Sequence, residues 1–128
     1  MTKSQVGIME DSRAEKLEAL ETLVEFNEKV VKNIGILMKE LSGQRLDDTD
    51  KFQDSIVNAV NWEIQVVNAT LDVLNEGKER IVKEIFNEKV LALGEAIKEK
   101  SDQKLVKAFE ELRPELEKLG MAAKEVIG

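Results

Sequence analysis

The chain has 128 residues, of which 42% are hydrophobic and 35% charged, with a net charge of −7 at pH 7. A chain of this length can bury a core of its own without disulfides or metals. Its seven Gly and single Pro are too few for the turns of an all-β fold, so we predict an all-α protein. Cys and His are absent, which excludes thiolate and imidazole chemistry, and we expect no cofactor.

The acidic charge and the hydropathy pattern limit the partners that we expect. Binding to nucleic acid or to an anionic membrane needs clustered cations, which a net charge of −7 opposes. Residues 1–10 contain no apolar run of signal-peptide length, and no segment approaches the roughly 20 apolar residues of a membrane span. We therefore expect a cytoplasmic protein that binds neither nucleic acid nor membrane.

Apolar residues recur at helical spacing in four segments, which predict helices at about 12–41, 49–76, 78–100 and 102–126. The first helix begins at a capping box, Ser12 to Glu15, after an N-terminal tail of residues 1–11. Short connections make sequential helices antiparallel. Residues 12–128 are therefore predicted to form one domain, an up-down four-helix bundle.

Two residues interrupt the helical pattern. Gly77 is either a tight turn between two helices or a kink in one long helix, and we favour the turn because a single long helix would strand apolar surface. Pro114 lies inside the last segment, where proline deletes a helical hydrogen bond. The apolar phase is the same on both sides of Pro114, so we predict a kinked, continuous helix, with a break at Pro114 as the alternative.

Neutral amides dominate one face of the second predicted helix. Ordinary solvated helix faces carry Lys and Glu, which form helices better than Asn does. The only Trp of the chain lies beside this face, and Trp is frequent at binding hot spots. The predicted partner-binding residues are Asn58, Asn61, Trp62, Gln65, Asn68, Asp72 and Asn75. An inter-helix or homodimer contact is the alternative interpretation of the same face.

Two polar residues fall at apolar positions of the pattern. Asn27 lies in the apolar stripe of the first helix, and Glu63 lies beside the stripe of the second, in heptad register with Ile56 and Thr70. Antiparallel pairing brings Asn27 and Glu63 to the same level. They are either a buried polar layer that fixes register, a ligand contact, or side chains that tilt out to water.

Acidic residues gather at the start of the second helix, where Asp47, Asp48 and Asp50 are weak candidates for a metal site. Helix capping and the helix dipole explain acids at this position equally well, so we expect no bound metal.

No residue pattern predicts a particular reaction. Our leading interpretation is a non-enzymatic interaction protein, an adaptor or chaperone-like module that docks a partner helix, or a second copy of itself, on the face of amides and Trp62. Two alternatives stay open. One is a structural homo-oligomeric subunit, and the other is a carboxylate–Mg²⁺ enzyme directed at phosphates through Asp47, Asp50 or Glu63.

Overall fold

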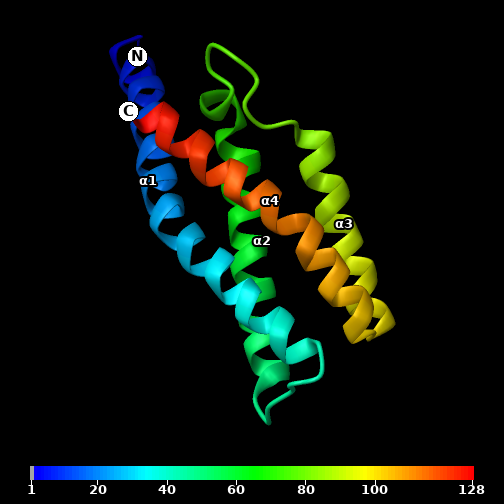
Figure 1. Ribbon diagram of the computed structural model, residues 1–128. Helices are drawn as coiled ribbons and strands as arrows, with labels where there is room; N and C mark the ends of the chain where they lie inside the picture. Colours follow the sequence, from blue (N-terminus) through cyan, green and yellow to red (C-terminus); the bar gives the residue numbers. More distant parts are fainter. Residues whose placement is uncertain (1) are drawn as a thin grey trace.

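The computed structural model describes the backbone of residues 2–128 and the side chains of residues 12–128. It contains four helices, α1 (Thr2–Leu41), α2 (Thr49–Leu74), α3 (Lys83–Glu99) and α4 (Asp102–Ile127), and no strand among the described residues. The helices form a bundle in which α4 runs obliquely across the others (Figure 1). The predicted all-α bundle of four helices is therefore confirmed.

The helices do not pack equally around the bundle. Helix α1 packs closely against both α2 and α4, and α4 packs against α3. Helices α2 and α3 follow one another in the chain, yet within these two fully described helices no pair of Cα atoms comes within 8 Å. One side of the bundle is therefore more open than the other three.

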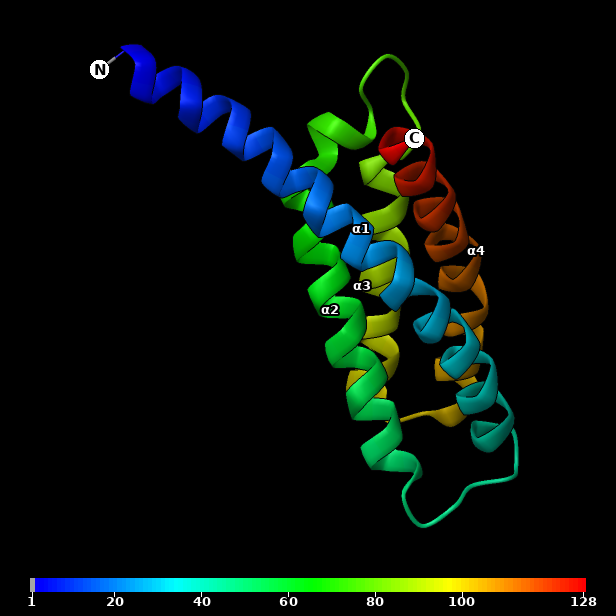
Figure 2. The ribbon, with the colours of Figure 1, turned by 90° about the vertical axis from the view of Figure 1, so that its left-hand side faces the viewer.

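Helix α1 is longer than predicted. It begins at Thr2 and passes without interruption through the expected capping box, so the predicted start at Ser12 is wrong. Residues 2–11, expected to be a tail, form its first turns and extend past the other helices (Figure 2). The side chains of residues 1–11 lie outside the described part. A Ser-x-x-Glu pattern caps a helix only where the preceding backbone is not helical.

Gly77 belongs to a turn, as predicted, but the turn is longer than expected. Helix α2 ends at Leu74 and α3 begins at Lys83, so the predicted start of the third helix near residue 78 is wrong. The Asn75 Oδ1 atom accepts hydrogen bonds from the backbone N–H groups of Arg80 and Ile81, at 2.8 and 2.9 Å. The Asn75 side chain thereby binds the backbone of residues 80 and 81, which are not helical, within the turn that precedes α3.

Helix α4 begins and continues as predicted. The Ser101 hydroxyl accepts a hydrogen bond from the backbone N–H of Lys104 at 3.3 Å, which caps the first turn. The helix then runs through Pro114 to Ile127, and its path curves rather than breaks (Figure 1). Pro114 is exposed, so water can reach the carbonyl that lost its helical partner.

The core lies along the contact of α1, α2 and α4 and extends to α3. Burying each large aliphatic or aromatic side chain stabilises the fold by roughly 1.5–3 kcal/mol. The largest fully buried apolar side chains are Leu20, Leu23, Ile34, Leu37, Leu74, Phe86, Leu105, Phe109, Leu112, Leu116 and Leu119. None of the described helices is long and apolar enough to traverse a lipid bilayer.

Candidate interaction surface

The amides of α2 lie on the side of the helix that faces away from the core. Asn58, Asn61, Gln65 and Asn68 are all exposed, whereas Glu63, on the opposite side of the helix, is buried. We call these four exposed residues the amide row. Their side chains are exposed to solvent, and that they bind a partner stays a prediction.

The two C-terminal members of the predicted set have structural partners. Asp72 is exposed, and its carboxylate accepts a hydrogen bond from the Lys16 ammonium of α1 at 2.9 Å. This bond holds the pKa of Asp72 below its usual value. Asn75 is half-buried in the turn after α2, where its amide Nδ2 donates to the Ile81 carbonyl at 3.0 Å. Both residues organise the fold, and we place neither in the interaction surface.

Trp62 lies on the flank of α2 that faces α1. It is half-buried, and its ring meets the Phe26 ring edge to face, with centroids 5.2 Å apart and planes at 77°. Such aromatic pairs add roughly 0.5–1.5 kcal/mol to the contact of two helices. Trp62 therefore joins α2 to α1 and does not line the open side of the bundle.

A groove of about 390 Å³ lies between α2 and α3, where the two helices stand apart. Its lining is mainly apolar, and one member of the amide row, Asn61, lies at its edge. Glu95 and Lys98 are its only charged lining residues. The groove is lined by Val57, Val60 and Asn61 of α2 and by Val90, Leu91, Leu93, Gly94, Glu95, Ile97 and Lys98 of α3.

Leu91 is the residue of this groove that the sequence did not reveal. It is 70% exposed, and among the described large hydrophobic residues only Met121 is as exposed. Its position is off the apolar stripe of α3, so periodicity alone assigns it to solvent. Only the placement of α2 beside it makes Leu91 part of an apolar groove.

The two polar residues at core positions are both buried. Asn27 is 4% exposed and Glu63 is 0% exposed. The Asn27 Nδ2 atom donates to the Leu116 carbonyl of α4 at 2.9 Å, and no hydrogen bond joins Asn27 to Glu63 directly. Burial raises the pKa of the Glu63 carboxyl from 4.5 to about 8.

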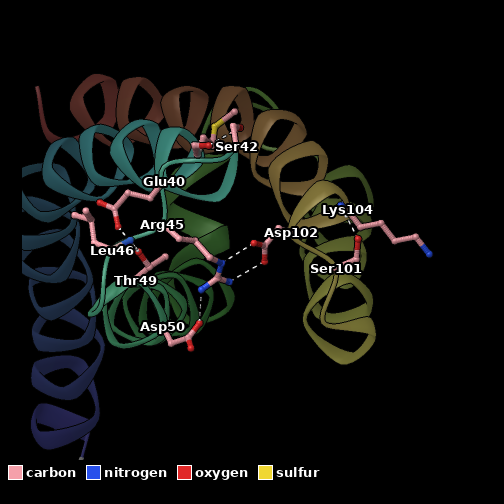
Figure 3. A network of polar contacts seen from close by, with 10 residues as sticks. Glu40, Ser42, Arg45, Leu46, Thr49, Asp50, Ser101, Asp102 and Lys104 are labelled. Atoms are coloured by element: carbon pink, nitrogen blue, oxygen red, sulfur yellow. Dashed lines mark hydrogen bonds and ion pairs between the residues drawn. The ribbon is translucent and has the colours of Figure 1, made fainter.

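The acidic loop before α2 is held by an arginine. The Arg45 guanidinium donates to both carboxylate oxygens of Asp102, at 2.6 and 2.7 Å, and to Asp50 at 2.9 Å (Figure 3). Its hydrogen bonds keep the pKa of Asp102 below the usual value. Among the residues whose side chains are described, no three acidic side chains converge as a metal site requires. Arg45 thus fastens the loop both to Asp50 at the start of α2 and to Asp102 at the start of α4.

The chain matches no known family model, none of the curated proteins and no solved structure.

Proposed function

We propose that the protein is a non-enzymatic interaction module, an adaptor or chaperone-like bundle, whose groove between α2 and α3 holds an amphipathic helix of a partner protein. The observation that carries this proposal is the separation of α2 and α3 along an apolar groove. Consecutive helices of a bundle normally bury their apolar stripes against each other. Here the two helices leave an apolar groove between them, and Leu91 in the lining of that groove is 70% exposed.

A helix is the partner element that fits best. The groove lies between two helices, so a third helix can pack its side-chain ridge between them, as helices pack in bundles. Recognition of this kind uses apolar anchors at spacings of three and four residues. Gly94 favours close approach, because nothing lies within 4 Å of the position that a Cβ atom would occupy there.

The amide row supplies the polar edge of the proposed surface. Asn and Gln both donate and accept hydrogen bonds, and they lose less hydration energy on burial than charged side chains do. Asn58, Asn61, Gln65 and Asn68 can therefore bond to the polar flank of a docked helix. Trp62 is left out of this surface, because its ring packs against Phe26 of α1.

The proposal predicts that a charge introduced into the groove abolishes partner binding. We expect Leu91→Lys to reduce the capture of a specific protein from native lysate by at least about tenfold, since a lysine head group must then be desolvated on docking. The measurement is quantitative mass spectrometry of proteins retained by the immobilised chain.

Met121→Lys is the matched control. Met121 is 71% exposed, but it lies on α4 and outside the groove. Both variants should melt like the wild-type protein, because neither position is buried. The proposal is wrong if no captured protein depends on Leu91, or if Met121→Lys removes the same proteins. Concentration-dependent self-association that Leu91→Lys abolishes would instead indicate a homo-oligomeric subunit.

A further inference from the structure

The buried polar residues Asn27 and Glu63 leave three oxygen atoms without a hydrogen-bond partner. These atoms are Asn27 Oδ1 and both carboxylate oxygens of Glu63, and all three are shielded from solvent. Buried oxygens are nearly always paired, so an unpaired group requires a physical explanation. All three atoms are hydrogen-bond acceptors, so what each of them lacks is a donor.

The two residues lie at the same level of the α1–α2 contact. The residues that precede them, Phe26 and Trp62, place their rings 5.2 Å apart. The position of the Asn27 amide is fixed by its Nδ2 donor, which binds the Leu116 carbonyl of α4 at 2.9 Å. Because the amide is planar, with Nδ2 and Oδ1 on different sides, Oδ1 turns away from that carbonyl.

We propose that Glu63 is a proton-binding site, in which the carboxyl group of the folded protein is neutral at neutral pH and donates its O–H to Asn27 Oδ1. A protonated carboxyl is a donor as well as an acceptor. One proton therefore gives a partner to an oxygen of each residue. The resulting chain of hydrogen bonds runs from Glu63 of α2 through Asn27 of α1 to Leu116 of α4 and ties three helices together at one level.

The surroundings of Glu63 favour the neutral form. Its pKa is raised to about 8 by burial alone, without a contribution from a neighbouring charge. Three ion pairs involve charged side chains of α1 and α4, and Glu25 and Lys29, which flank Asn27 on α1, are exposed to solvent. Glu28 lies 3.4 Å from Lys124, Arg113 lies 3.6 Å from Glu117, and Lys118 lies 3.3 Å from Glu115. Lys89 of α3 is half-buried. Along α2 the charged residues nearest to Glu63 in sequence are Asp54 and Asp72, which are both exposed, and Asp72 is bound to Lys16.

The proposal makes stability depend on pH in a defined direction. The pKa of Glu63 rises from 4.5 to about 8 on folding, so the folded state holds the proton more tightly than the unfolded state. The stabilisation is complete below pH 4.5, decreases as the pH rises, and is lost above about pH 8. Glu63 thus makes the bundle more stable at mildly acidic than at alkaline pH.

The direct test is a pH titration of ¹³C- and ¹⁵N-labelled wild-type protein by NMR. We expect the Glu63 carboxyl carbon to titrate near pH 8 and the Asn27 side-chain amide to shift with the same midpoint. The proposal is overturned if the Glu63 carboxyl carbon titrates near pH 4.5. It is also overturned if the chemical shifts of the Asn27 side-chain amide do not change as Glu63 titrates.

Glu63→Gln provides a second readout, because its amide can donate to Asn27 Oδ1 at every pH. This variant should match the wild type near pH 5 and become increasingly more stable than it toward pH 9, as measured by urea unfolding. Glu115→Gln is the control, since Glu115 is half-buried but paired with Lys118, and its difference from the wild type should stay constant. The proposal is contradicted if the difference in unfolding free energy between Glu63→Gln and the wild type also stays constant between pH 5 and pH 9.

Discussion

Gly120 illustrates how a single missing side chain sets the distance between two helices. A Cβ atom at this position of α4 would lie 2.7 Å from the Asn27 Nδ2 atom, closer than any ordinary contact. The glycine is buried, although its intrinsic helix propensity is lower than that of alanine. Gly120 therefore makes room for Asn27 to reach the backbone of α4.

Gly120→Ala should consequently destabilise the protein by roughly 1–3 kcal/mol, because Asn27 must move and its hydrogen bond to Leu116 is lost. Gly94→Ala is the matched control, since a Cβ atom there meets nothing within 4 Å. That change should stabilise α3 by roughly 0.5–1 kcal/mol. Urea unfolding measures both, and equal effects of the two changes would show that the close contact is not structural.

At the scale of elements, the turn between α2 and α3 is built around side chains and not only around Gly77. Asn75 binds the backbone of Arg80 and Ile81, and the Arg80 guanidinium donates to the carbonyls of Leu74 and Glu76, at 3.0 and 2.7 Å. These bonds satisfy carbonyls that the end of α2 leaves free. The turn therefore holds α3 at a defined distance from α2.

We expect Asn75→Ala to lower the free energy of unfolding by roughly 1–3 kcal/mol, since it removes three hydrogen bonds to the turn. Asn68→Ala is the comparison, because Asn68 is exposed in the middle of α2 and alanine is the better helix former. Asn68→Ala should change the free energy of unfolding by no more than about 0.5 kcal/mol. Denaturant titrations measure the free energy of unfolding of both variants. If Asn75→Ala leaves this free energy unchanged, the turn does not depend on the Asn75 side chain.

At the scale of the whole molecule, the packing of α3 differs from that of the other helices. Its backbone approaches closely only α4, whereas α1 packs against both α2 and α4. Helix α3 is also the shortest of the four, and Val82, Ile85 and Leu91 leave apolar surface exposed along it. We therefore expect the α1–α4 contact to be the most stable part of the bundle and α3 to be its least stable helix.

Native-state hydrogen exchange should reveal this difference. We expect the amides of α3 to exchange through a local opening that costs less free energy than global unfolding, because few tertiary contacts must break. The amides in the buried middle of α1 and α4 should exchange only on global unfolding. Uniform protection across all four helices would contradict this view. A partner helix docked between α2 and α3 should raise the protection of α3 toward that of α4.

The sequence by itself determined the features that depend on local spacing. Helical periodicity predicted four helices, a bundle and an unbroken helix through Pro114, because a residue's phase on its own helix decides which way it faces. The same phase turned Asn27 and Glu63 toward the core, where both are buried, and turned Asn58, Asn61, Gln65 and Asn68 outward.

Only the tertiary structure decided how the helices meet. The long turn at Asn75 and the spacing of α2 from α3 follow from side chains that bind backbone outside their own helix. The place of Trp62 against Phe26, and of Asn27 against Leu116, depends on contacts between segments far apart in the chain. Periodicity describes one helix at a time, so it cannot state which pair of helices stays apart. That separation places Leu91 in the groove where we propose a partner helix binds.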